Sequence, residues 1–247
     1  MSGHSKWSQI KRQKGVTDAK RGQAFTKLGN AITIAVRQGG GITDPTSNFK
    51  LRLMMEKARE ANMPKENIQR AIDRAVGKGQ GAQLEEVVFE GFGPSGVGIL
   101  VEAVTDNRLR TLASVKNIFD RGGGTLGSSG SVFYLFNLLG VIFLPKKQQK
   151  EMSADDLLLL AIEGGAEEVE EADDGYEIYT KPNELHKVKE ELLGKGLLVE
   201  SAELTMKPSS LINVEAEDVT KIIEFLEKLE DLDDVQKVYS NANFVAK

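Results

Sequence analysis

The chain has 247 residues, of which 40% are apolar and 28% charged, with a formal net charge of −5 at pH 7. It is long enough for two or three compact domains, and the absence of cysteine from the sequence excludes disulfides, thiolate nucleophiles and cysteine-based metal sites. Only His4 and His186 remain as histidine ligands or general bases, so we predict no metal, no cofactor and no enzymatic activity.

The net charge hides a strong division along the chain. Residues 1–80 contain 16 Lys and Arg against 6 Asp and Glu, a net charge of +10, whereas the remainder has 16 against 31 and carries −15. A cationic end attracts polyanions, and an acidic body repels them. A solvated charged face is the alternative interpretation, but Trp7, the only Trp in the sequence, lies within the basic run and favours a nucleic-acid or ribosome surface.

Residues 1–17 have no apolar periodicity and contain Gly3, Gly15 and scattered Lys, which predicts an arm that orders on binding a partner. No apolar segment follows this basic run, and no stretch of the sequence reaches the length of a membrane span. We therefore expect a cytoplasmic protein that does not contact a membrane.

Three stretches of residues 18–77 have apolar side chains at helical spacing. The first runs from a cap at Asp18 to the glycines at 39–41, the second begins at Ser47 or Asn48, and the third begins at Pro64 and ends at Gly77. Each has a single apolar stripe, so the three helices are stable only when packed together as a small domain. The Gly-rich segment 78–81 then predicts a linker.

Beyond the linker the apolar period becomes that of strands. Residues 87–90 and 98–104 flank the segment Gly91–Gly96, which contains the pattern G-x-G-x-x-G. Because a second strand follows, and because Pro94 lies inside the loop, we predict a β-hairpin instead of a dinucleotide site. A second Gly-rich loop, residues 124–131, could cradle a phosphate or form tight turns, and the sequence leaves both interpretations open.

The second half of the chain predicts two units with the order β-α-β-β-α-β. The inner unit has strand 140–144, helix 154–163, strands 166–171 and 175–180, helix 183–193 and strand 197–205. The flanking pieces repeat this order with strand 97–104, helix 108–121, strand 131–137, strand 210–215, helix 216–229 and strand 234–240. The acidic runs 167–174 and 227–234 lack the glycine-punctuated pattern of a calcium loop, so we interpret them as solvated surface.

Short distinctive segments also lie along the whole chain. They are Gly3–Trp7, Asp18–Gly22, Phe25–Leu28, Asn62–Ile68, Arg70–Ile72, Thr105–Arg108, Leu126–Val132 and Leu232–Gln236. With these segments the chain closely resembles the YebC/PmpR family. The resemblance implies a three-domain protein without enzymatic activity, which in some members is a DNA-binding transcriptional regulator and in others a ribosome-associated factor, including a mitochondrial translational activator.

Two places depart from the family pattern. Asn137-Leu138-Leu139 stands where many members have a charged Glu-Arg-Lys run, and Asn30 stands where an acidic residue is expected in the first helix.

We therefore predict an α+β fold with an N-terminal three-helix domain followed by two ferredoxin-like βαββαβ domains, one inserted into the other. The predicted domains are residues 1–80, residues 81–138 with 207–247, and the inserted residues 139–206. The predicted function is that of a non-enzymatic, DNA-binding transcriptional regulator, and the alternative is a ribosome- and rRNA-associated translation factor that activates or rescues elongation. The expected partner is nucleic acid, either DNA or ribosomal RNA on the ribosome, with no small-molecule substrate. The residues expected to contact nucleic acid are His4, Lys6, Trp7, Lys11, Arg12, Lys14, Lys20, Arg21, Lys27, Arg70, Arg74, Arg108 and Arg110.

Overall fold

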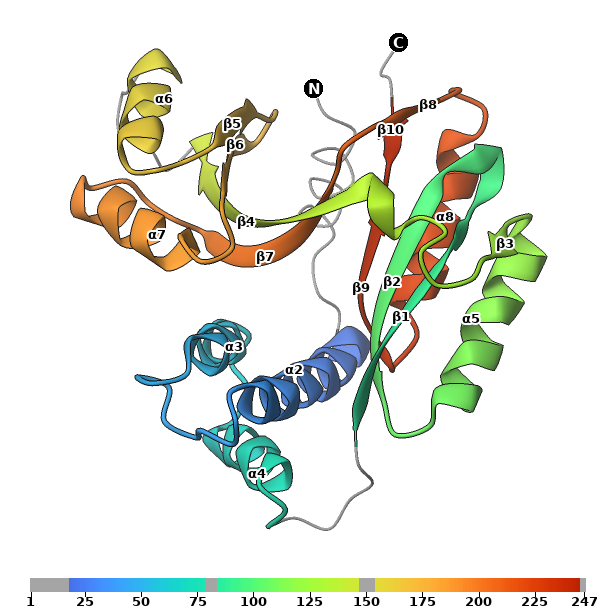
Figure 1. Cartoon of the computed structure of the whole chain (residues 1–247), viewed down its shortest axis with the longest axis horizontal. Coiled ribbons are helices and arrows are strands. Elements are labelled where there is room, and N and C mark those ends of the chain that lie inside the picture. The colour runs from blue at the N-terminus through green and yellow to red at the C-terminus, as the bar shows by residue number, and fades with distance from the viewer. Residues whose placement is uncertain (1–17, 79–83, 147–153, 245–247) are drawn as a thin grey trace. The chain divides into compact units, whose positions relative to one another are not determined.

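The computed structural model describes residues 18–78, 84–146 and 154–244, and the structural statements below concern these residues (Figure 1). They form two compact units. One contains the described residues up to Val132 together with Thr220–Val238, and the other contains Phe133–Val219 together with the residues from Tyr239 onward. Among the described residues, no helix is both long and apolar enough to cross a membrane.

The first unit begins with the three predicted helices, α2 (Asp18–Gln38), α3 (Phe49–Glu60) and α4 (Lys65–Ala75). Of the two candidate caps for α3, Asn48 is the one used, because its side-chain oxygen accepts the Leu51 amide at 3.1 Å. Its amide nitrogen also donates to the carbonyl of Ala35 at 3.0 Å, which ties the start of α3 to α2.

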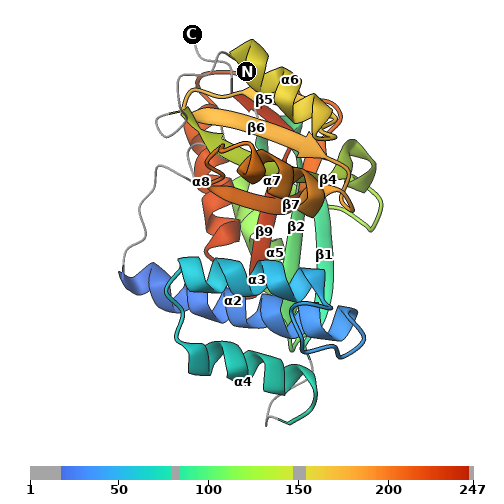
Figure 2. The ribbon, with the colours of Figure 1, turned by 90° about the vertical axis from the view of Figure 1, so that its left-hand side faces the viewer.

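Helix α2 packs against both α3 and α4 (Figure 2), and the apolar stripes of the three helices meet in one core. Burying a large aliphatic side chain stabilises a fold by about 1.5–3 kcal/mol, so the three short helices hold one another in place. The buried members of this core are Ile32, Ala35, Val36, Leu51, Ala58, Met63, Ile68, Ala71 and Ile72.

The predicted hairpin is confirmed. Strands β1 (Glu85–Phe92) and β2 (Gly98–Thr105) are antiparallel, with Phe92 opposite Gly98. The turn between them is a short 3-10 segment, η1 (Pro94–Gly96), in which Gly96 has a φ of 75°. No helix starts at the third glycine of the pattern, so this loop lacks the geometry of a dinucleotide site.

The outer sheet has the strand order β3-β1-β2-β9, where β3 is Thr125–Leu126 and β9 is Val235–Ser240. Helices α5 (Arg108–Gly122) and α8 (Val219–Glu230) belong to the same unit. The two helices pack closely: the rings of Phe119 and Phe225 make an edge contact with centroids 5.1 Å apart.

The outer strands differ in part from the predicted set. Residues 131–137 do not form a strand of the outer sheet: Phe133–Leu135 is a 3-10 segment, η2, and Phe136 already begins the long strand β4 (Phe136–Pro145). The predicted strand 140–144 instead begins earlier, at Phe136, and only the last two residues of the predicted strand 131–137 belong to it. Gly140 lies inside β4 and serves close packing, because an added Cβ would crowd the Thr180 hydroxyl and lie 2.9 Å from the Cβ of Leu185. The predicted strand 210–215 is shorter, β8 (Ile212–Val214), and pairs in parallel with β10 (Ala242–Phe244).

The inner unit follows the predicted order, β4-α6-β5-β6-α7-β7. Its sheet has the order β5-β6-β4-β7, which is the ferredoxin-like arrangement, and β4 is antiparallel to both of its neighbours. The further elements are α6 (Ala154–Glu163), β5 (Glu168–Glu171), β6 (Gly175–Thr180), α7 (Leu185–Gly194) and β7 (Ser201–Pro208). The α+β class is confirmed, while the boundaries at 80, 138 and 206 stay a prediction.

Candidate nucleic-acid interface

The basic arm that the sequence singled out lies outside the described residues. This holds for His4, Lys6, Trp7, Lys11, Arg12 and Lys14. Lys20 and Arg21 belong to the first turn of α2, where the structure describes the helix but not their side chains. The remaining residues that were predicted to contact nucleic acid, from Lys27 onward, lie in three different parts of the structure.

Lys27 is bound within the protein. Its ammonium group donates to the backbone carbonyl of Glu230, the last residue of α8. Nearby, the Gln23 side-chain amide donates to the carbonyl of Asp231 at 2.6 Å. The final carbonyls of a helix carry partial negative charge, so a lysine in this position stabilises the end of α8.

Arg70 and Arg74 lie together in a groove between α2 and α4, with a volume of about 670 Å³. We call it the α2–α4 groove. Arg70 is exposed, and its guanidinium donates to the side-chain oxygen of Asn67. Arg74 is partly buried. The residues that line the groove are Gly22, Phe25, Thr26, Gly29, Asn30, Met63, Asn67, Arg70, Ala71, Asp73, Arg74 and Lys78.

Two buried polar side chains of α2 hold Arg74 in place. Its Nη2 donates to Asn30 Oδ1 at 2.9 Å and to Thr33 Oγ1 at 2.9 Å, and its Nε approaches the same hydroxyl at 3.2 Å. Thr33 is fully buried and Asn30 is 8% exposed. The Thr33 hydroxyl lies within hydrogen-bond distance of the carbonyls of Gly29 and Ala71, at 2.9 and 3.0 Å, which fixes its oxygen toward Arg74.

The pKa of Arg74 is lowered, first by burial of the guanidinium and second by repulsion from Arg37. An arginine nevertheless stays protonated at neutral pH, so the groove keeps this charge. Arg37 itself donates from Nη1 to the carbonyl of Leu84 at 2.8 Å. The side chains lining the groove include three cations, Arg70, Arg74 and Lys78, against the carboxylate of Asp73.

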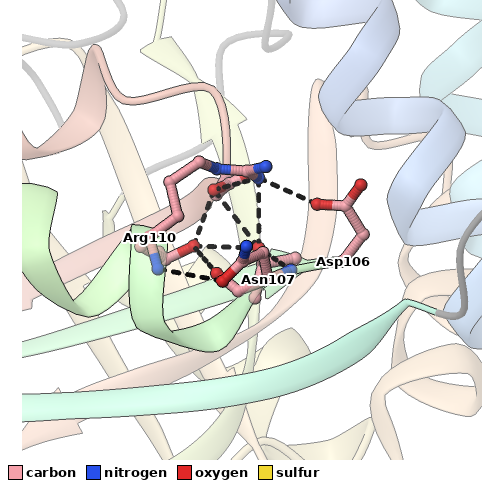
Figure 3. A network of polar contacts seen from close by, with 6 residues as sticks. Asp106, Asn107 and Arg110 are labelled. Atoms are coloured by element: carbon pink, nitrogen blue, oxygen red, sulfur yellow. Dashed lines mark hydrogen bonds and ion pairs between the residues drawn. The ribbon is translucent and has the colours of Figure 1, made fainter.

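Arg108 and Arg110 lie at the start of α5 and have different surroundings. Figure 3 shows Arg110 with Asp106 and Asn107. Arg110 Nη2 lies 2.9 Å from Asp106 Oδ1 and 2.9 Å from Asp234 Oδ2. These hydrogen bonds, with that to Asp234 the stronger cause, raise the pKa of Arg110. Arg108 is exposed, and its side chain makes no hydrogen bond or ion pair with any residue that the structure describes.

Asp234 joins three elements at this point. Its Oδ2 accepts the hydroxyl of Thr111 at 2.6 Å, and its backbone oxygen accepts the amide of Val104 at 2.8 Å. Asn107 caps α5 by accepting the Arg110 amide at 3.1 Å. The network therefore fastens β2, α5 and the start of β9 together, and the Arg110 guanidinium is committed to it.

The Gly-rich loop 124–131 is bound by a residue that the sequence reasoning missed. Glu90, in β1, is 5% exposed, and its carboxylate accepts the amides of Gly130 at 2.7 Å and Val132 at 2.9 Å. The Gly127 amide donates to the backbone oxygen of Glu90 at 2.8 Å. A phosphate in this loop would need such amides, so their use by Glu90 favours the tight-turn interpretation. The signal was a carboxylate that directly follows the apolar run Val87–Phe89.

The described residues contain no group of His, Asp or Glu side chains suited to hold a metal ion. Fold and site thus define an α+β protein in which a basic three-helix bundle precedes an outer sheet and an inserted ferredoxin-like unit. Residues 5–78 match the domain described as the TACO1/YebC protein N-terminal domain, and residues 84–242 match the TACO1/YebC second and third domain. The chain belongs to the TACO1/YebC family.

Relatives match along almost their whole length. A protein of Chloroflexus aurantiacus, named a probable transcriptional regulatory protein, is 50% identical over 100% of this chain and 97% of its own. A protein of Persephonella marina with the same name is 52% identical over 98% of this chain and 95% of its own. The crystal structure of a conserved hypothetical protein from Aquifex aeolicus has a TM-score of 0.85 and 44% identity, covering 95% of both chains.

Proposed function

We propose that this protein is a non-enzymatic regulator of gene expression that acts in the cytoplasm by binding DNA and controlling transcription. The observation that carries the proposal is the division of charge, +10 in residues 1–80 against −15 in the rest. The names of the relatives, probable transcriptional regulatory proteins, support the same reading.

In this proposal the basic arm and the helical bundle bind the phosphate backbone. Contacts of lysine and arginine with phosphates position a protein on nucleic acid without reading its sequence. Each neutralised phosphate releases counterions, so affinity depends on salt. Within the bundle, Lys50, Arg59 and Lys65 are exposed cations on α3 and α4 that can add to the attraction. The acidic remainder repels the polyanion and so orients the protein with its N-terminal part toward it.

Two of the residues that were predicted to contact nucleic acid, Lys27 and Arg110, stabilise the protein fold. Lys27 and Arg110 each bind oxygen atoms of the protein, whereas Arg70, Arg74 and Arg108 keep donors available. We therefore expect Arg108→Ala to weaken binding without loss of stability, and Arg110→Ala to lower the stability of the start of α5.

The test is a titration of the full chain with a labelled DNA duplex at several salt concentrations, with ribosomal RNA fragments of matched length as a parallel series. For about five phosphate contacts, log K falls against log salt with a slope of about −4.5 on duplex DNA. An affinity that does not change with salt would contradict the proposal. Tight binding to ribosomal RNA together with weak binding to DNA would indicate that the protein controls translation instead of transcription.

A further inference from the structure

Arg74 differs in the charge of its partners from two other cations that are held within the described part of the protein, Arg110 and Lys207. Arg110 faces the carboxylates of Asp106 and Asp234, and Lys207, whose side chain is 13% exposed, lies 2.7 Å from Glu168 and 2.9 Å from Glu170. Arg74 is also partly buried, yet the described residues offer it only the neutral oxygens of Asn30 and Thr33. A buried charge is costly unless an opposite charge pairs with it.

The guanidinium keeps donors for a further partner. Of its nitrogen atoms, Nε and Nη2 bind Asn30 and Thr33, while Nη1 hydrogen-bonds no residue in the described part of the chain. Arg74 lines the α2–α4 groove, so these donors are available beside an open volume. A free NH₂ group of a guanidinium donates charge-assisted hydrogen bonds to anionic oxygens, above all those of a phosphate.

The rim of the groove has the matching charge. Arg70 and Lys78 are both exposed and line the same groove as Arg74. Asp73 also lines the groove, and its carboxylate accepts the side-chain amide of Gln69 at 3.0 Å. A volume of about 670 Å³ lies within the range of ligand sites and admits a phosphodiester with its neighbouring sugars.

The geometry points to the α2–α4 groove as a binding site for one phosphodiester group of a nucleic acid, with Arg74 as the anchor and Arg70 and Lys78 as rim contacts. This inference rests on the proposed function and adds to it the place where the helical bundle binds the phosphate backbone of the nucleic acid. The site is preorganised, because Asn30 and Thr33 are buried and fix the guanidinium before any ligand arrives.

Asn30 sets the charge of this site. Its Oδ1 lies 2.9 Å from Arg74 Nη2, at the position where a carboxylate would neutralise the guanidinium. An aspartate has nearly the same shape as an asparagine. Asn30→Asp therefore supplies the missing counter-charge from within the protein and removes the need for a phosphate, while leaving the packing of α2 unchanged.

The experiment compares Asn30→Asp with Asn117→Asp in the full chain. Asn117 is exposed on α5 and gives the same change in chemistry and in net charge at another place. We expect Asn30→Asp to weaken binding of a DNA duplex about tenfold and to reduce the magnitude of the salt slope by about 1, whereas Asn117→Asp changes affinity less than about twofold. The melting temperature of Asn30→Asp should rise by about 2–4 °C, because Arg74 gains an ion pair. Equal losses of affinity in the two variants would overturn the inference.

A second measurement keeps this inference separate from the proposed function. Inorganic phosphate should raise the melting temperature of the wild-type chain and of Asn117→Asp, but not of Asn30→Asp. Lys78→Gln, which changes only an exposed rim residue, should reduce the shift in part. If phosphate stabilises the wild type through this groove while no nucleic acid binds, the groove stands and the proposed function falls. If phosphate stabilises wild type and Asn30→Asp alike, the groove is not the site.

Discussion

Glu90→Gln tests how the Gly-rich loop is held. The wild-type carboxylate accepts the amides of Gly130 at 2.7 Å and Val132 at 2.9 Å from a position that is 5% exposed. A glutamine of the same size can accept one of these amides, but its NH₂ group then faces the other donor. A hydrogen bond to a charged group contributes about 1.5–3 kcal/mol. Glu90→Gln removes one such bond and makes the other a weaker bond to a neutral acceptor, so we expect the free energy that holds the loop closed to fall by about 2–3 kcal/mol.

Amide hydrogen exchange measures this loss locally, which suits a chain of two units whose global unfolding need not be a single transition. A loss of about 2–3 kcal/mol in the free energy of local opening corresponds to exchange about 30 to 140 times faster at Gly130 and Val132. Glu85→Gln, an exposed change at the start of the same strand, is the control and should leave both amides protected. If Glu90→Gln exchanges as slowly as the control, the carboxylate does not hold the loop.

Two further predictions concern the inner unit. Tyr179 is fully buried, and burial, with the charge of Glu177 as the next cause, raises its pKa above that of free tyrosine. The folded state thus binds this proton more tightly than the unfolded state, so the contribution is complete below about pH 10 and stability falls as the pH rises beyond it. Denaturation at pH 8 to 11 should show this fall, and Tyr179→Phe should lessen it; an unchanged slope would refute the assignment. For the insertion, the Ser209 amide donates to the Leu135 carbonyl at 2.8 Å, so the two ends of the β4–β7 ladder already meet. A chain in which a short Gly-Ser linker replaces the predicted inserted domain, residues 139–206, should keep a cooperative melt, and loss of that cooperative melt would show that the domain boundaries are misplaced.

Local periodicity was enough to predict the helices, the hairpin and the order of the inner unit. The apolar stripe through Ile68, Ala71 and Ile72 identifies α4 because three or four residues make one helical turn. The same reasoning failed at residues 131–137, which were predicted to form a strand of the outer unit, whereas the structure has a 3-10 segment there and then the start of β4. The tertiary neighbours of this segment are distant in sequence: Gly140 of β4 packs against Leu185, 45 residues away, and no local pattern contains that neighbour.

The candidate site was predictable in composition but not in arrangement. Charge counting selected Arg70, Arg74 and Arg110 alike. Their roles depend on partners far along the chain: Asn30 is 44 residues before Arg74, and Asp234 is 124 residues after Arg110. Such pairs depend on the tertiary fold. The sequence alone therefore could not distinguish Arg74, which has neutral partners, from Arg110, which has two carboxylate partners.

The position of β9 in the outer sheet has a consequence for the order in which the protein folds during synthesis. Strand β2 lies between β1 and β9, yet β9 is made more than one hundred residues after β2. The inner sheet is complete once Pro208 has left the ribosome, whereas the outer sheet waits for Ser240. Until then β2 presents an open edge, and Arg110 and Thr111 lack Asp234. A chain that ends at residue 208 and has been released from the ribosome should therefore contain a folded inner unit and an outer unit that is still exposed to proteases and chaperones.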